Sequence, residues 1–213
     1  MQRTIIAALI AAAAFTSAHA ASINGLVNTG VGASGTADTH YSLSNENKVS
    51  VPVVTFDNVW PISPWLANST DSKWITPTAN QAQSFDPSAN GTYTYSLSFN
   101  LTGYDAHTAA LAGRFAADNT AVVLLNGTQI GSSNGFTSWS SFATSAGNGF
   151  VAGNNTLQFV VTNWGQATGN PTGLRVEFTG SNVAAVPEPE TYAMMLAGLG
   201  LVGLVARRRK QAA

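Results

Sequence analysis

The chain has 213 residues, 45% of them hydrophobic and only 9% charged, against about 25% charged in ordinary globular domains, so uncharged side chains have to make its surface polar. The absence of cysteine excludes disulfides, thiol catalysis and thiolate metal sites. The net charge is −1, and the only basic residues outside the termini are Lys48, Lys73, Arg114 and Arg175, which excludes the clustered cations that nucleic-acid binding needs.

The N-terminus has the three parts of a secretory signal peptide. Arg3 precedes an apolar run over residues 5–15, and the small residues Ala18 and Ala20 follow it. We therefore predict a helical signal peptide over residues 1–20, exported through the Sec translocon and cut by signal peptidase after Ala20. The alternative is an N-terminal membrane anchor, for which this run is too short, because a span needs about 20 apolar residues.

The body begins with a segment of low hydrophobicity and continues into a region of short strands. Residues 21–50 are rich in Gly, Ser and Asn, and they predict an irregular arm with a short strand near 41–43. Residues 51–180 predict one β-sandwich domain, because no part of them keeps a helical period. The clearest strand is 92–101, where apolar and polar residues alternate strictly.

Further strands follow from the same alternation and from turn residues. Asn126-Gly127 predicts a tight hairpin, since both residues tolerate positive φ. Many short strands separated by Gly and Asn turns are typical of an antiparallel sandwich or jelly roll, so the predicted fold class is all-β. The predicted strands besides 41–43 and 92–101 are 51–56, 111–117, 120–125, 128–130, 156–162 and 174–178.

The C-terminus is the most specific part of the chain. Residues 181–191 predict a short linker that holds Pro187, Glu188 and Pro189. An apolar run over 192–206 predicts a short transmembrane helix, and residues 207–213 predict a basic cytoplasmic end, which leaves the body outside. The basic residues that would stop the helix in the membrane are Arg207, Arg208, Arg209 and Lys210.

This tail resembles the PEP-CTERM sorting domain, which has a Pro-Glu-Pro motif, a short membrane helix and an Arg-rich end. The resemblance implies a substrate of exosortase, a membrane protease of exopolysaccharide-producing bacteria. It implies transient retention in the inner membrane, cleavage near the motif, and an extracellular or cell-surface location. The same tail is found on some ice-binding proteins, but it is a sorting signal and does not predict ice binding.

The body resembles a galactose-binding-like β-sandwich of the carbohydrate-binding-module type. Three strings carry the resemblance: Asp118-Asn119, Asn126-Gly127, and Gly153 to Leu157. Modules of this type often hold a structural calcium ion, so the resemblance makes Asp57, Asp118 and Glu177 candidate ligands. No other cofactor is predicted.

Two of the five tryptophans are candidate sugar platforms. Trp139 and Trp164 lie in polar, loop-like sequence, where a tryptophan of the core is less expected. A pyranose face stacks on an exposed indole, while burial of either ring is the alternative. The remaining tryptophans fit the core or the attachment of the arm.

No catalytic constellation is visible. The acids of the body are scattered singly, whereas glycoside hydrolysis needs two carboxylates at a defined separation. Asp38 and His40 lie two residues apart, so an extended backbone brings both side chains to one face and permits contact. No nucleophile motif accompanies them, and we predict no catalytic residue.

The leading hypothesis is an exported, non-enzymatic protein that binds carbohydrate or is associated with the exopolysaccharide matrix of its producer. A second hypothesis is a structural or adhesive surface protein, an ice-binding protein included. The third is an enzyme acting on glycosides. Exposure of the two loop tryptophans would favour carbohydrate binding. A flat, ordered array of Thr side chains would favour ice binding, and two carboxylates in one cleft would favour an enzyme.

Overall fold

The computed structural model describes residues 20–45, 48–56, 63–186 and 189–211. The chain forms two compact units, of which one is Ala20–Ala184 and the other joins Met1–His19 with Ala185–Ala213. Of the predicted signal peptide, only Ala20 belongs to the described residues. Asp57, a candidate calcium ligand, lies outside them.

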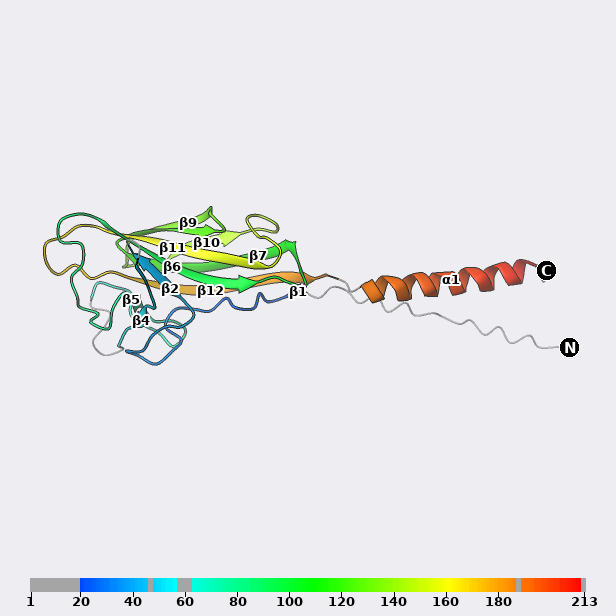
Figure 1. Cartoon of the computed structure of the whole chain (residues 1–213), viewed down its shortest axis with the longest axis horizontal. Helices are drawn as coiled ribbons and strands as arrows, with labels where there is room; N and C mark the ends of the chain where they lie inside the picture. Colours follow the sequence, from blue (N-terminus) through cyan, green and yellow to red (C-terminus); the bar gives the residue numbers. More distant parts are fainter. Residues whose placement is uncertain (1–19, 46–47, 57–62, 187–188, 212–213) are drawn as a thin grey trace. The chain divides into compact units, whose positions relative to one another are not determined.

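The body is an all-β structure (Figure 1) in which the pairings described are antiparallel, as the alternating sequence predicts. Its strands are joined in one sheet of order β3-β2-β6-β11-β8-β9-β10-β7-β12-β5-β4, with β1 paired to β12. The strands are β1 (Ala20–Ala21), β2 (Ser42–Asn45), β3 (Lys48–Ser50), β4 (Val53–Val54), β5 (Ile75–Thr76), β6 (Gly91–Asn100), β7 (Tyr104–Asp118), β8 (Thr120–Leu125), β9 (Thr128–Asn134), β10 (Ser140–Thr144), β11 (Asn154–Asn163) and β12 (Gly173–Ala185).

The sheet curls so that two parts of it face each other as a sandwich. Strands β2, β6, β11 and β8 form one layer, β10, β7 and β12 form the other, and β9 connects them. Phe115 of β7 and Phe142 of β10 meet Phe159 of β11 across the core, with ring centroids 5.7 and 5.6 Å apart. The predicted antiparallel sandwich is therefore confirmed.

Alternation decides which side chains enter this core. In β6 the odd-numbered residues from Tyr93 to Phe99 are buried and the even-numbered ones are not. Asn126 and Gly127 have φ values of 48° and 85°, as the predicted hairpin requires. The predicted strands 92–101 and 156–162 correspond to β6 and β11.

The predicted arm is irregular between β1 and β2, and it packs on the sandwich as part of the folded body, a point that the sequence left open. Ile23, Tyr41 and Leu43 are buried in the main core. The hydroxyl of Thr29, also buried, accepts a hydrogen bond from the Val176 amide in β12 at 2.9 Å. The segment has few apolar residues, and the sequence did not show that Ile23, Tyr41 and Leu43 point inward while Val31 stays exposed.

The predicted linker also begins later than expected. β12 continues to Ala185, because Val183 is fully buried and pairs with Ala21 of β1. Residues 181–185 are therefore strand. Strand β10 was missed, since Ser140–Thr144 has one large apolar residue, Phe142, and gives almost no periodic signal.

A second, smaller core covers the other face of β7. Phe115 points into the sandwich, so its neighbour Ala116 points out of it, against Trp65 and Trp74. The two indole rings lie 4.3 Å apart between centroids. The segment that contains both tryptophans thus lies on the sheet as a third layer.

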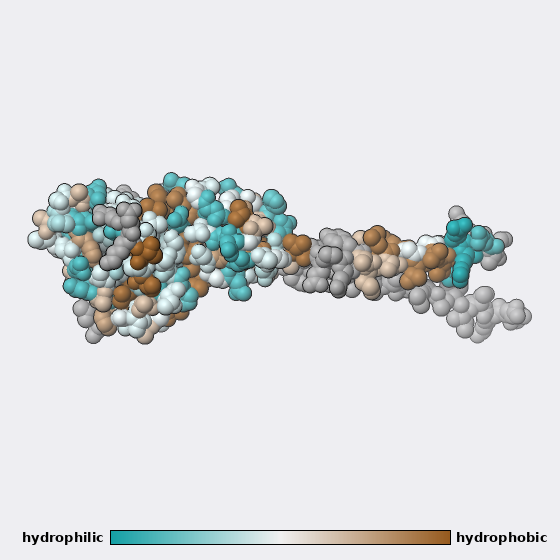
Figure 2. All heavy atoms as spheres, in the orientation of Figure 1, coloured by the Kyte–Doolittle hydropathy of each residue, from teal (hydrophilic) through white to brown (hydrophobic). Residues whose placement is uncertain are grey.

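The described residues of the second unit form the helix α1 (Pro189–Gln211). It includes the predicted apolar segment 192–206, whose side chains from 193 onward are exposed, and Figure 2 shows its apolar residues in brown before a teal basic end. Among the residues that the structure describes, no helix combines the length and the apolar character needed to cross a membrane.

We expect Gly113→Ala to destabilise the body by about 1–3 kcal/mol, the usual cost of overpacking a core. A Cβ at this position in β7 would lie 2.3 Å from the Phe142 ring and 2.7 Å from the Glu177 carbonyl oxygen. Gly180→Ala in β12 is the matched control, because nothing lies within 4 Å of its Cβ position. Urea unfolding of both variants measures the difference, and equal stability would contradict the packing described.

Candidate functional site

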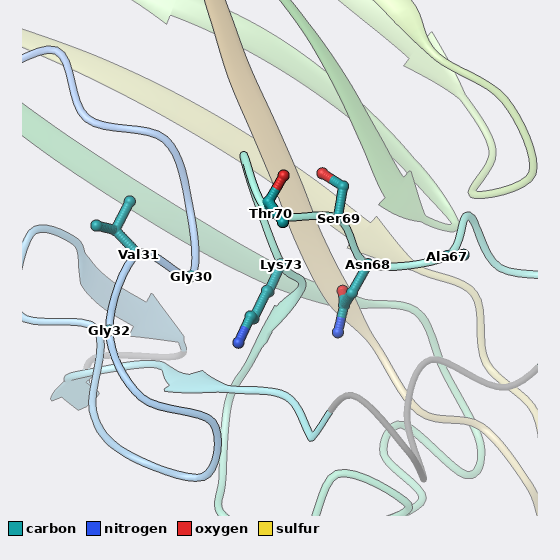
Figure 3. Close-up of a pocket in the computed structure, with 8 residues that line it drawn as sticks. All are labelled: Gly30, Val31, Gly32, Ala67, Asn68, Ser69, Thr70 and Lys73. Carbon is teal, nitrogen blue, oxygen red and sulfur yellow. The ribbon is translucent and has the colours of Figure 1, made fainter.

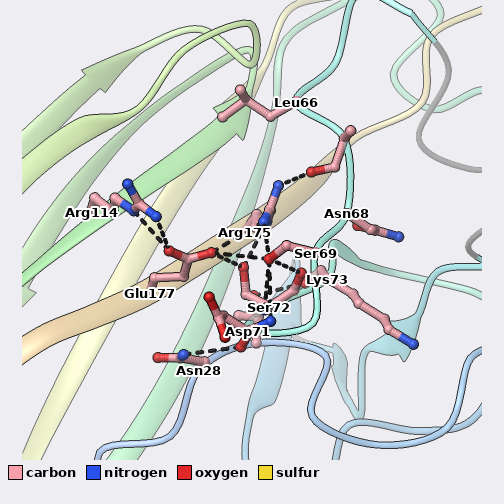
Figure 4. A network of polar contacts seen from close by, with 12 residues as sticks. Asn28, Leu66, Asn68, Ser69, Asp71, Ser72, Lys73, Arg114, Arg175 and Glu177 are labelled. Carbon is pink, nitrogen blue, oxygen red and sulfur yellow. Dashed lines mark hydrogen bonds and ion pairs between the residues drawn. The ribbon is translucent and has the colours of Figure 1, made fainter.

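Glu177 of β12 is the centre of a polar network on the outer face of the sheet (Figure 4). Arg114 of β7 donates to its Oε2 from Nε at 2.8 Å and from Nη2 at 2.5 Å. Arg175 Nη2 and the Ser72 hydroxyl both donate to Oε1, at 3.1 and 2.7 Å. Arg175 and Glu177 are buried, so each charge is compensated by the other side chain instead of by water.

The same contacts keep this network ionised. Burial lowers the pKa of Arg175, and the Glu177 carboxylate opposes that change. Burial also acts to raise the pKa of Glu177. Hydrogen bonds from Ser72 and Arg114, together with both arginine charges, outweigh it and hold that pKa below its ordinary value.

Arg175 fastens the tryptophan-bearing segment to the sheet. Its guanidinium donates to the Ala67 carbonyl, to Ser69 Oγ at 2.8 Å and to Ser72 Oγ at 2.7 Å. Three contacts from one buried cation hold this stretch of backbone in place. The network is therefore structural in its main effect.

Trp139, one of the two predicted sugar platforms, belongs to this network. The Cζ atoms of Arg114 and Arg175 lie 4.6 and 4.7 Å from its ring, within the range of cation–π attraction. The indole also packs against the second core around Trp65 and Trp74. At least one face of Trp139 is thus occupied by arginine of this chain.

A hollow of about 650 Å³ lies beside this network (Figure 3). Asn68 and Lys73 border it, together with the backbone of Gly30 and Gly32. The Asn68 amide already bonds the Trp74 amide and the Thr55 hydroxyl, and Lys73 donates to Ser34. No aromatic side chain is among its described lining residues, so it offers no stacking surface to a sugar.

Trp164, the other predicted platform, has a different environment. Its side chain is 52% exposed at the end of β11. Its amide donates to Asn119 Oδ1 at 2.6 Å, and its carbonyl accepts from Asn170 Nδ2 at 2.8 Å. An exposed indole therefore stands on backbone that is held from both sides.

The loop that carries Trp164 is joined to the loop before β6. The Gly165 amide donates to Asn90 Oδ1 at 2.9 Å, and the Gln166 amide donates to the Asp86 carbonyl at 3.0 Å. A Cβ at Gly165 would lie 2.8 Å from the Ala89 backbone, so only glycine permits this approach. These contacts hold the backbone that carries the indole before any ligand arrives.

Two amide donors lie next to this tryptophan. Asn90 and Asn119 use Oδ1 to accept the backbone amides of Gly165 and Trp164, which fixes the orientation of both side chains. Their Nδ2 groups have no hydrogen-bond partner among the described residues. A stacking surface with oriented donors beside it is the arrangement that a sugar ring and its hydroxyls require. The sequence identified Trp164 but neither asparagine, since Asn90 and Asn119 are brought together from connections that are distant in sequence.

Asp118 is buried at the end of β7. Burial raises its pKa to about 7, which a hydrogen bond from Trp65 opposes. Its Oδ1 atom has no hydrogen-bond partner among the described residues. Because the pKa of Asp118 is about 7 in the folded protein, this carboxyl takes up a proton on folding at pH values between its ordinary pKa and about 7.

The predicted calcium ligands are not gathered in the described part of the chain. Asp57 lies outside it, Glu177 is engaged by two arginines, and Asp118 is a buried carboxyl. In residues 20–45, 48–56, 63–186 and 189–211, no three His, Cys, Asp or Glu side chains are grouped as a metal ion would need. Calcium binding stays a prediction.

The predicted contact between Asp38 and His40 is present, with Oδ1 and Nδ1 3.2 Å apart. Asp38 is almost fully buried, and it also accepts the amides of Gly30 and His40. Its two oxygens therefore organise the turn between residues 30 and 40. This is a structural role, and it leaves the prediction of no catalytic residue as it stands.

The processing sites are described only in part. Ala20 lies in β1, whereas Ala18 lies outside the described residues. Pro187 and Glu188 also lie outside them, and Pro189 is the first residue of α1.

Residues 185–210 match the family model described as the PEP-CTERM protein-sorting motif. The chain carries a PEP-CTERM sorting signal. A PEP-CTERM signal implies an exported protein, transient membrane anchoring and an exosortase partner.

No curated protein matches the chain in sequence. Its body is similar to three solved structures of low identity. The FMN-binding β-glucuronidase from Facaelibacterium prausnitzii L2-6 is 18% identical with a TM-score of 0.36, covering 66% of this chain and 22% of the enzyme, so the chain spans about a fifth of that protein.

The other two similar structures are carbohydrate-binding modules. A family 35 module from an environmental isolate is 15% identical, with a TM-score of 0.31, over 71% of this chain and 98% of the module. The CBM36-1 domain of a multidomain xylanase from the hindgut metagenome of Trinervitermes trinervoides is 10% identical, with a TM-score of 0.28. The match covers 70% of this chain and 99% of that domain. All three TM-scores lie below 0.5.

We expect Asp118→Asn to gain stability relative to the native protein as pH rises from about 4 to about 7. The raised pKa of about 7 means that the folded state holds a proton that the unfolded state has released above about 4. The native protein therefore loses stability progressively between pH about 4 and about 7, where only its folded state holds the proton, while the asparagine variant does not titrate. Urea unfolding across this pH range measures the difference, and a difference independent of pH would contradict the assignment.

Proposed function

We propose that this protein is exported, sorted by exosortase, and binds carbohydrate through Trp164. The observation that carries the proposal is the half-exposed indole on backbone held by Asn119 and Asn170. A pyranose ring presents C–H groups on its face, which pack against an indole, and hydroxyls at its rim, which need hydrogen-bond partners. The Nδ2 groups of Asn90 and Asn119 supply such partners beside the ring.

Preorganisation supports the same proposal. Binding loses free energy when flexible side chains and loops become ordered, so a ligand gains affinity when the site is rigid beforehand. The Gly165 contact with Ala89 and the bonds of Asn170 to both loops order this site without a ligand. Trp139 does not share these properties, because arginine already covers its ring.

The sorting part of the proposal concerns where the protein acts. We propose that the signal peptide is removed after Ala20 and that α1 holds the protein transiently at the inner membrane. The exposed apolar side chains of α1 and its basic residues at 207–209 support such an anchor. Exosortase would then cut near Pro187 and leave the body outside, where the exopolysaccharide of the producer is the nearest polymer.

We expect Trp164→Ala to weaken binding of a recognised polysaccharide by about 30-fold, the loss of about 2 kcal/mol typical of a central aromatic contact. The full chain in mild detergent is measured by affinity electrophoresis and calorimetry against a panel of neutral and acidic polysaccharides. Trp139→Ala is the matched control. It should reduce thermal stability, through loss of its contacts with Arg114 and Arg175, and leave affinity unchanged. Equal loss of affinity in both variants would overturn the choice of Trp164.

We expect removal of residues 187–189 to leave the full-length protein in the membrane fraction of an exosortase-containing producer. The native protein should be found outside the cells, shortened at its C-terminus, with Ala21 as its first residue. Mass spectrometry of both fractions measures the two ends. Release of the deletion variant in the same shortened form would contradict sorting through this motif.

A further inference from the structure

The outer face of β6, β11 and β8 is continuous and its composition is unusual. It consists of the even-numbered residues in 92–98, 120–124 and 156–162, which alternate with buried odd-numbered ones. Register places Thr92 beside Thr162 and Thr162 beside Thr120, so three hydroxyls stand in one row across the strands, and Ser98 lies beside Thr156. We refer to these outward residues as the hydroxyl face.

The hydroxyl face carries no charge. Its members are Thr and Ser, apart from Gln158 and a small apolar group in which Val160 lies beside Val122, next to Leu124. Figure 2 shows pale, near-neutral hydropathy over much of the visible body, as such residues produce. An acidic polymer would find no cation among these residues, and a basic one would find no carboxylate.

The hydroxyl face leads toward the tryptophan site. Thr162 points outward and Asn163 is fully buried, so continuing the alternation by one residue directs Trp164 to the outer side. Its 52% exposure agrees with that direction. At about 3.4 Å per residue, the line from Thr156 to Trp164 is about 27 Å long, which is the length of several linked sugar rings.

We propose that the hydroxyl face and Trp164 together bind one extended chain of an uncharged polysaccharide. This inference rests on the proposed function and adds the ligand class and the direction of the chain. The tryptophan stacks one ring, Val160 and Val122 face the C–H groups of the next rings, and the Thr and Ser hydroxyls bond to sugar hydroxyls. Each such bond contributes little by itself, so affinity accumulates with chain length.

Two free hydroxyl groups provide the means to test this. Thr94 and Thr156 lie on the hydroxyl face away from Trp164, and neither hydroxyl bonds to a described residue. Thr→Val keeps the shape and β-propensity of the side chain while removing the hydroxyl. Thr179→Val in β12 is the matched control, since Thr179 is an exposed threonine on the other layer.

The experiment measures calorimetric affinity of the full chain in mild detergent for neutral gluco- and manno-oligosaccharides from disaccharide to octasaccharide, with uronic-acid oligosaccharides in parallel. We expect the neutral octasaccharide to bind about tenfold more tightly than the disaccharide, which corresponds to about 1.4 kcal/mol. Thr94→Val with Thr156→Val should remove this gain and leave disaccharide binding intact, whereas Thr179→Val should change neither.

The outcomes separate the two proposals. Binding that needs Trp164 but does not depend on chain length would overturn the extended track and keep the tryptophan site. Preference for uronic-acid chains would overturn the uncharged ligand class. Absence of binding to every sugar tested would overturn both proposals.

Discussion

The sandwich depends on the packing of one side chain, Phe142, between two glycines. In β10 its direct neighbours across the sheet are Gly113 of β7 and Gly131 of β9. A Cβ at either glycine would lie within 2.6 Å of Phe142 atoms. The Phe142 ring lies over Gly113 and its Cβ lies against Gly131, so β9, β10 and β7 approach closely while the same ring contacts Phe115 and Phe159. The two layers and their common core follow from that curl.

Three of the few charged residues of the body form one network that holds the second core on the sheet. Arg114, Arg175 and Glu177 are concentrated in one network, where two cations and one carboxylate hold the segment with Trp65 and Trp74 on the sheet. A partner removed from such a buried pair leaves an uncompensated charge, which is strongly destabilising. The network therefore holds the second core on the sheet in one arrangement.

The two loop tryptophans show how position changes the role of the same residue type. The indole of Trp139 is attached to the arginine network, whereas the hydrogen bonds described for Trp164 are made by its backbone. The backbone attachment leaves the indole available and fixes its base. A surface that is polar without charge is then well suited to an uncharged, hydroxyl-rich polymer, because desolvation of ions does not oppose contact.

Local sequence was enough to predict the strands whose apolar residues alternate, such as β6 and β11, the hairpin at Asn126-Gly127, and the sorting signal, because each is encoded by neighbours along the chain. Only the tertiary structure decided that residues 21–45 belong to the body, that β10 exists, and that Arg covers Trp139 while Trp164 stays exposed. These depend on partners distant in sequence, such as Thr29 with Val176 or Asn119 with Trp164. Local periodicity carries no record of such contacts, since it reports which face of a strand is apolar and not what comes to lie on that face.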